Sequence, residues 1–445
     1  MVNLRLRSFI RWLLVVDRPI PARSEEEIRA EVERHYRWNF SVNLLDGAVF
    51  WLGLSFMSSA TIMPLFVSKL TTSQLAIGLI SIIANSGWFL PQLFTAHWVQ
   101  RLPRMKPVVV NLGFFTERLP VWLLPLAALV ASRSPGLALA LFFLGYAGHA
   151  LGAGLVATAW QDMLARVFPV NRRGRFFGLT TFVGNTSGTL GAAFSAWLLA
   201  ALAFPGNFVA TFGLAALFIT ASWVFLALTR EPAQPPAAPR QNGQQFWRSL
   251  RTILREDGNF RRFLVARLLV VLGGMGGGFV TVAAVNRWSV PDGVVGLYTT
   301  AFMLGQAVGT LAAGFVADRV GHKLPYTLGV VAAAAGYGLA WLSPAPAWYY
   351  AVFLLLGGAL GAAVVSGTMI ALEFSAPHLR PTYVGMINTA MGLMGIVSPL
   401  LGAWLASRSY NLLFAVGTAL TLVGLAALIW GVREPRRLQA QTKAT

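Results

Sequence analysis

The chain of 445 residues has little charge and no cysteine. Only 11% of its residues are charged, whereas a soluble globular domain carries about 25%. The absence of cysteine excludes disulfides and every metal site that needs a thiolate. The five histidines are too scattered to form a structural zinc site. Because 56% of the residues are hydrophobic, burial in lipid explains this composition better than one large soluble core.

The sequence also lacks the motifs of an enzyme or an ATP-driven pump. It contains no phosphate-binding P-loop and no constellation of nucleophile, metal or phosphate ligands, so we expect no enzymatic activity and no cofactor. The formal net charge of +19 would suggest a nucleic-acid partner in a soluble protein. Basic residues that flank membrane helices explain the charge without nucleic acid, because anionic lipid headgroups attract them.

Twelve apolar runs are long enough to cross a bilayer core, which needs about 20 residues per helix. They lie at 42–67, 73–98, 107–131, 136–163, 176–202, 206–228, 260–285, 294–317, 324–342, 347–374, 382–406 and 410–432. With both termini inside, 29 lysines and arginines fall on the cytoplasmic side and four fall outside. This asymmetry predicts an all-α, multi-pass protein of the plasma (inner) membrane with both ends cytoplasmic.

The chain divides into an arm, two bundles of six helices joined by a linker, and a tail. The boundaries are 1–40, 41–228, 229–259, 260–432 and 433–445. Basic and apolar residues in the arm and at 246–255 in the linker are typical of amphipathic helices on the inner membrane surface. A disordered tail is the alternative for the arm. Within the arm, Ser24 and Glu27 form a capping-box pattern that predicts the start of a helix.

An internal repeat supports the division into two bundles. Residues 76–79 resemble residues 294–297 at an offset of 218, and the same offset carries Arg101 onto Arg319. Two six-helix halves related as parallel repeats are a known transporter architecture, with the substrate site near the midplane between them.

A loop motif in the second half carries a family resemblance. Residues 314–323 read Gly-Phe-Val-Ala-Asp-Arg-Val-Gly-His-Lys and resemble the motif G-x-x-x-D-R-x-G-x-K of the major facilitator superfamily. The first-half copy is degraded, because Gln100 replaces the Asp and Pro103 replaces the inner Gly. The resemblance covers residues 40 to 432 and implies the twelve-helix fold of that family. It also implies that this loop latches a cytoplasmic gate, through Gly314, Asp318, Arg319, Gly321, Lys323, Arg101 and Arg104.

The motif has a physical interpretation. A small residue at Gly314 would let two helices approach closely. Asp318 would pair with Arg319 or with a neighbouring helix dipole. The alternative is that Arg319 only follows the positive-inside rule. Because Gln100 is neutral, we expect the two halves to gate unequally.

Five ionisable residues fall within predicted membrane helices, where each charge costs several kcal/mol unless it is paired or solvated. They are Asp46, Glu117, Arg118, His149 and Arg267. The resemblance implies that helices one, four, seven and ten line a central cavity, which places Asp46, His149 and Arg267 beside it.

Two hypotheses follow for these charges. Asp46 and Arg267 could form a pair that opens and closes with the gate; the alternative is that both reach the inner headgroups. Glu117 or His149 could carry a coupling proton, because both groups bind and release protons; a structural ion pair is the alternative for Glu117. Successive side chains point about 100° apart on an α-helix, so we expect Glu117 and Arg118 to have other partners.

Polar and aromatic residues on the predicted helices are candidates for a substrate pocket. They are Phe50, Trp51, Asn85, Trp88, Gln92, Tyr146, Trp160, Gln161, Gln306 and Asn388. Lipid exposure or packing is the alternative for each. The glycine run 273–278 predicts a break in the seventh helix, since glycine costs about 1 kcal/mol relative to alanine, and discontinuous helices bind substrate in such transporters. Because Arg267 is the only well-placed cation, neutral, amphipathic or cationic cargo is favoured.

The leading prediction is a monomeric secondary transporter that moves a small molecule by alternating access. Proton-coupled efflux of a lipophilic or neutral compound is expected first. In the fifth helix, Gly184 and Gly188 resemble a Gly-rich antiporter motif, although packing of small residues also explains them. The alternatives are uptake of a sugar-like solute, flipping of a lipid, or a receptor or scaffold that transports nothing.

Overall fold

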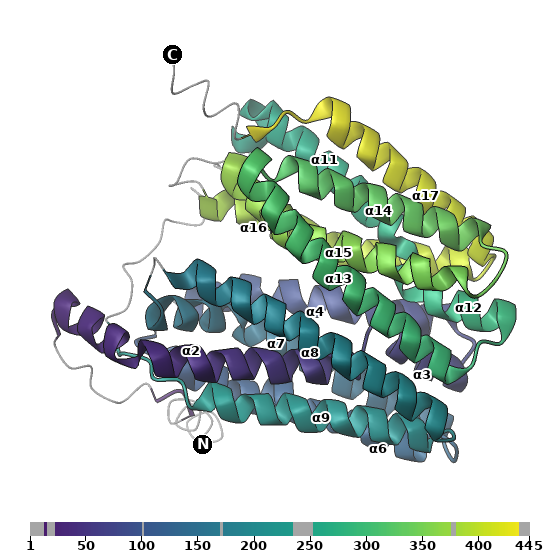
Figure 1. Cartoon of the computed structure of the whole chain (residues 1–445), viewed down its shortest axis with the longest axis horizontal. Coiled ribbons are helices and arrows are strands. Elements are labelled where there is room, and N and C mark those ends of the chain that lie inside the picture. The colour runs from purple at the N-terminus through teal and green to yellow at the C-terminus, as the bar shows by residue number, and fades with distance from the viewer. Residues whose placement is uncertain are drawn as a thin grey trace, which may run out of the picture. The chain divides into compact units, whose positions relative to one another are not determined.

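The structure is a computed structural model. It describes residues 13–15, 23–99, 102–169, 172–234, 252–374 and 380–435. Every regular element in these ranges is a helix (Figure 1). The helices form two compact units: one from 1–57, 87–191 and 202–239, the other from 58–86, 192–201 and 240–445.

The first unit contains the helices of the amino-terminal half, apart from segments that pack in the second unit. They are α2 (Glu25–Ser55), the end of α4 (Gln74–Val99), η1 (Val108–Leu112), η2 (Phe114–Arg118), α5 (Leu119–Val121), α6 (Leu123–Val130), α7 (Pro135–Val167), most of α8 (Arg173–Ala201) and α9 (Gly206–Ala227). Helix α2 begins where the sequence predicts. Ser24 Oγ accepts from the Glu27 backbone N–H at 3.2 Å, and Glu27 Oε2 accepts from the Ser24 N–H at 2.9 Å.

The second unit contains the helices of the carboxy-terminal half. They are α11 (Gly258–Gly273), η4 (Gly274–Phe279), α12 (Val280–Trp288), α13 (Asp292–Val320), α14 (Lys323–Leu342), α15 (Trp348–Phe374), α16 (Arg380–Ala406), α17 (Tyr410–Ala426) and η6 (Ala427–Gly431). Helix α3 (Ile62–Leu70), the start of α4 and the end of α8 also pack in this unit, although they precede the linker.

Ten helices in the described ranges are long and apolar enough to cross a membrane. Two predicted spans are not among them. The run at 42–67 is interrupted by turns after Ser55, and α8 at 176–202 carries many polar residues. The twelve-helix count and the orientation of the termini stay predictions, as does the division at the linker.

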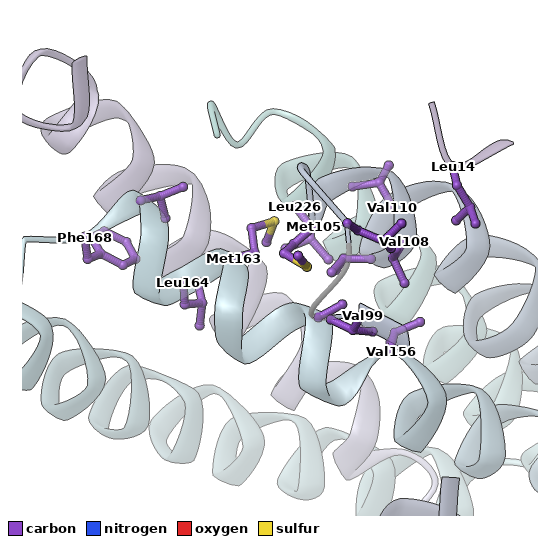
Figure 2. Packing of buried hydrophobic residues seen from close by; sticks show 14 of the residues in the cluster. Leu14, Val99, Met105, Val108, Val110, Val156, Met163, Leu164, Phe168 and Leu226 are labelled. Atoms are coloured by element: carbon purple, nitrogen blue, oxygen red, sulfur yellow. The ribbon is translucent and has the colours of Figure 1, made fainter. Parts of the chain in front are cut away.

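An apolar cluster joins helices of the first unit near the predicted cytoplasmic side (Figure 2). Figure 2 shows Met105, Met163 and Leu226 meeting between three helices. Leu14 of the arm also belongs to the cluster, and Asn111 Nδ2 donates to the Leu13 carbonyl at 2.7 Å. The rest of the predicted arm helix and most of the predicted linker helix lie outside the described residues.

The predicted break in the seventh helix is present. Helix α11 ends at Gly273, and residues 274–279 form a 3₁₀ turn before α12. Backbones approach closely around the break: a Cβ on Gly273 would lie 2.2 Å from Thr421 Oγ1. The glycines therefore serve packing as well as the change of helix type.

The close helix approach predicted at Gly314 is not seen among the described residues, and its gating role stays a prediction. A Cβ placed on Gly314 would meet nothing within 4 Å among the described residues. Helices α13 and α15 instead meet at Gly309 and Gly305, about one and a half to two and a half turns earlier on α13. A Cβ on Gly305 would lie 2.1 Å from the Leu354 carbonyl oxygen, and one on Gly357 would lie 2.0 Å from the Phe302 carbonyl oxygen.

Candidate functional site

Four of the five predicted intramembrane charges come together in the first unit. Glu117 and Arg118 form an ion pair, and both are only 5% exposed. His149 Nδ1 lies 3.0 Å from the Glu117 carbonyl oxygen. The guanidinium carbon of Arg118 lies 5.0 Å from the centroid of the Phe50 ring, which in turn lies 6.5 Å from the His149 ring. Acid, base, cation and aromatic ring thus share one buried site.

Asp46 is the fourth charge of this site. It is 7% exposed on α2, and its charge interacts with those of Arg118 and Glu117. Its Oδ1 has no hydrogen-bond partner among the described residues. We call Asp46, Glu117, Arg118 and His149, together with Phe50, the charged cluster.

The direct Glu117–Arg118 pair contradicts our expectation that each would have another partner. The reason is local, because η2 is a π-helical turn and not an α-helical one. The wider π-turn reduces the angle between successive side chains, and such turns are frequent at functional sites. The sequence pattern of adjacent Glu and Arg gave no indication of this turn.

Small residues of α7 bring His149 to Glu117. A Cβ on Gly152 would lie 2.0 Å from the Thr116 carbonyl oxygen, and one on Gly148 would lie 2.8 Å from Pro120 Cβ. Side chains are therefore excluded from this face of α7, and the backbones of the two helices touch. The spacing of Gly145, Gly148 and Gly152 was a signal for this contact that our sequence analysis did not use.

Arg267 has different surroundings, in the second unit. Its Nη1 donates to the Gly367 carbonyl of α15, and its guanidinium carbon lies 5.7 Å from the centroid of the Tyr326 ring. No described carboxylate lies within 4.0 Å of it. Asp46 and Arg267 belong to different units, so their pairing stays a prediction.

The intact loop motif joins α13 to α14. Asp318 and Arg319 are exposed at the end of α13. Gly321 has φ of 92°, a conformation that favours glycine, and a Cβ there would lie 2.7 Å from Glu434 Oε1. Lys323 Nζ donates to the Ile429 carbonyl at 3.3 Å. The gating role of these residues stays a prediction.

The degraded first-half loop has a carboxylate that our sequence analysis missed. Glu231, just after α9, accepts from the backbone N–H groups of Met105 at 2.8 Å and Lys106 at 2.7 Å. Arg166 Nη1 lies 3.7 Å from its Oε1. Burial raises the pKa of Glu231 and lowers the pKa of Lys106. Arg104 of the motif is partly buried, and Arg101 lies outside the described residues.

The predicted pocket residues are divided between the units. Tyr146 and Gln306 are buried, whereas Asn85 and Trp88 are exposed. Trp51 packs on Gly184, where a Cβ would lie 2.6 Å from Trp51 Cδ1. Of the remaining predicted pocket residues, Gln161 is exposed, and the others are partly buried: Phe50, Gln92, Trp160 and Asn388. Because these side chains lie in two units, a common pocket stays a prediction.

Residues from both halves of the sequence meet within the second unit. Lys69 Nζ lies 2.8 Å from Asp292 Oδ1. The hydroxyls of Thr61 and Thr299 lie 2.7 Å apart, and both residues are fully buried. By our predicted topology these contacts lie on the outer side.

A family model described as "Major Facilitator Superfamily" matches residues 45–289 and 280–445. The chain belongs to the major facilitator superfamily. Membership of this superfamily points to a membrane transport protein and not to an enzyme.

Individual relatives in this superfamily match only part of the chain. The gallate transporter of Pseudomonas putida is 30% identical over 172 residues, which cover 38% of this chain and 37% of the relative. The 4-hydroxybenzoate transporter PcaK of Pseudomonas aeruginosa is 29% identical over 193 residues, which cover 40% and 41%. The chain thus spans about two fifths of the length of these relatives.

Solved structures share the fold over most of the chain. A D-xylose-proton symporter aligns with a TM-score of 0.66 at 15% identity, covering 89% of this chain and 98% of the symporter. The nucleoside transporter NupG aligns with a TM-score of 0.66 at 13% identity, covering 87% and 99%. At these identities the likeness shows the superfamily fold alone.

Proposed function

We propose that the chain is a proton-coupled secondary transporter of the plasma membrane, working as a monomer by alternating access. The charged cluster is the observation that supports coupling to protons. Glu117 and Arg118 neutralise each other, which leaves Asp46 as the carboxylate in excess. An unpaired charge within the membrane is expensive, so binding a proton at Asp46 removes that cost.

This proposal changes the proton carrier that we expected from the sequence. Glu117 is engaged by Arg118, and His149 is held at the Glu117 carbonyl. Asp46 keeps Oδ1 without a hydrogen-bond partner among the described residues. A proton can therefore bind Asp46 without breaking the Glu117–Arg118 pair.

The proposal is tested by comparing proton movement across the membrane in the wild-type protein and in the Asp46→Asn variant. Everted vesicles with a pH-sensitive dye would be given a cargo panel that includes ethidium and 4-hydroxybenzoate. We expect at least one cargo to shift the pH gradient with the wild-type protein and not with Asp46→Asn. The control is Glu25→Gln, an exposed acid on the same helix. Proton movement that persists in Asp46→Asn would overturn this assignment.

For direction and cargo, efflux of a lipophilic or neutral compound is the first candidate, as the sequence predicts. Its support is that the charged cluster becomes neutral when Asp46 binds a proton, and that the cluster contains the Phe50 ring. Expression in a drug-sensitive host should raise resistance to a panel of lipophilic compounds, and a protonophore should abolish the gain. Unchanged sensitivity would count against efflux.

Uptake of small aromatic carboxylates is the second candidate. It is favoured by Arg118 over the Phe50 ring, a pairing of cation and aromatic face, and by the names of the gallate and 4-hydroxybenzoate transporters. Uptake of radiolabelled 4-hydroxybenzoate into cells would rise with expression if this candidate holds. Equal uptake with and without the protein would remove it.

A further inference from the structure

Arg267 is a partly buried cation in a predicted membrane helix, and no described carboxylate forms an ion pair with it. It lies on α11, nine residues after the first residue of the helix, which is about 14 Å at 1.5 Å per residue. Every side-chain carboxylate of the sequence except that of Asp17 falls in the described part of the chain, and none of these lies within 4.0 Å of Arg267. The charged cluster differs, since there Arg118 has Glu117 as its partner.

The surrounding residues leave room for this guanidinium. A Cβ on Gly367 would lie 3.2 Å from both terminal nitrogens of Arg267 and 3.3 Å from its central carbon. These distances are tighter than nine in ten real Cβ contacts, so any larger residue would press on the guanidinium. The Tyr326 ring lies on another side, held edge-on against Phe263 with centroids 5.9 Å apart.

The hydrogen-bonding capacity of Arg267 is mostly unused by the protein. A guanidinium has five N–H donors arranged as a planar fork. Among the described residues its only acceptor is the Gly367 carbonyl, and the residue keeps partial exposure. The remaining fork matches a carboxylate, which can accept two parallel hydrogen bonds.

We propose that Arg267, with Gly367 and Tyr326 around it, binds a single negative charge on the cargo, of the size of a carboxylate. This inference rests on the proposed transport function and names its substrate class as monovalent organic anions. It revises the neutral cargo expected from the sequence. One guanidinium neutralises one negative charge, so a bound monoanion removes the cost of the lone cation within the membrane.

The experiment compares an anion with its uncharged counterpart of nearly the same shape. Thermal unfolding of the purified full-length protein in detergent would be followed with benzoate and with benzamide. Binding to the folded state raises the unfolding midpoint. We expect benzoate to raise it and benzamide to have no effect. We expect Arg267→Gln to abolish the benzoate shift, and Arg267→Lys to keep part of it.

Two further variants keep the test decisive. Arg262→Gln removes an exposed arginine from the same helix and should leave the benzoate shift unchanged. If Arg267→Gln does not fold, Gly367→Ala replaces it; crowding of the guanidinium should weaken benzoate binding by about 3- to 10-fold, or roughly 0.7–1.4 kcal/mol. Equal shifts by benzoate and benzamide, or a benzoate shift that survives Arg267→Gln or Gly367→Ala, would overturn the proposal.

Failure of this inference can be told from failure of the transport proposal. Benzoate binding through Arg267 with no movement of any cargo in proteoliposomes would sustain the anion site and refute transport. Proton-coupled movement of ethidium with no benzoate shift would sustain transport and refute the anion site.

Discussion

The two bundles end in the same three residues, Arg-Glu-Pro, at 230–232 and 433–435. In the first unit Asn39 Nδ2 donates to the Arg230 carbonyl at 2.9 Å, and the Arg230 N–H donates to Asn39 Oδ1 at 2.8 Å. In the second unit Asn259 and Arg433 exchange the same two hydrogen bonds at 3.0 and 2.8 Å. In both units an asparagine of the first helix thus exchanges two hydrogen bonds with the backbone of the arginine after the last helix. We call these two contacts the asparagine clasps.

The glutamates that follow have different contacts. Glu231 is buried and accepts from two backbone N–H groups beside the loop that lost its Asp. Glu434 lies against Gly321 of the intact loop. In the first half this glutamate accepts two backbone N–H groups at the positive end of the helix that begins there. The two halves therefore differ in the contacts of this shared glutamate as well as in the Asp that the first-half motif lacks.

The largest expected effect comes from Glu231→Ala. Two buried N–H groups would lose their acceptor, and each unsatisfied donor costs roughly 1–3 kcal/mol. We expect the free energy of unfolding to fall by about 2–4 kcal/mol. Thermal unfolding in detergent would measure it, with Glu434→Ala as the matched control. Equal losses in the two variants would show that the two glutamates are equivalent.

The asparagine clasps should differ less. Asn39→Ala removes two hydrogen bonds at a fully buried position, which we expect to cost about 2 kcal/mol. Asn259→Ala removes the same pair where the site is open to solvent, and about 1 kcal/mol is expected. The same unfolding assay applies, and a larger loss for Asn259→Ala would contradict the comparison.

Gly321→Ala tests the intact loop alone. The left-handed φ of 92° costs a non-glycine residue about 1–2 kcal/mol. The new methyl group would also meet the Glu434 carboxylate, which can move aside. Unfolding midpoints of Gly321→Ala and of Gly314→Ala, where no described atom lies within 4 Å of the added Cβ, should separate clearly. Similar midpoints would remove the special role of Gly321.

The smallest effect is in the pH dependence of stability. Burial raises the pKa of Glu231 above 4.5, so just above that pH the unfolded chain releases a proton that the folded protein keeps. This group therefore makes stability fall as the pH rises from 4.5 to the folded pKa, and adds no further change above it. Glu231→Gln cannot titrate, so its unfolding midpoint should decline less over this interval. An identical slope would show that Glu231 does not titrate there.

Local signals in the sequence predicted local structure well. The capping box at Ser24 and the glycine run at 273–278 both marked features that the structure contains. What the sequence could not provide was contact between distant residues. Glu231 meets Met105 across 126 positions, and His149 meets the Glu117 carbonyl across 32. The π-turn at Glu117 also escaped prediction, because no residue type marks it.

Four of the five candidate charges are buried, and they could be found because charge within an apolar run is rare and visible. Their grouping was not predictable, since it depends on which helix faces touch. Gly152 decides that contact in the first unit, and Gly367 decides the surroundings of Arg267 in the second.

The contacts of Thr61 with Thr299 and of Lys69 with Asp292 have a consequence for dividing the chain. Cutting the linker near residue 240 would place residues 58–86 and 192–201 on one fragment and their packing partners on the other. Neither fragment alone could complete the second unit. Separately synthesised fragments should therefore complement each other when produced together, and each should be degraded when produced alone.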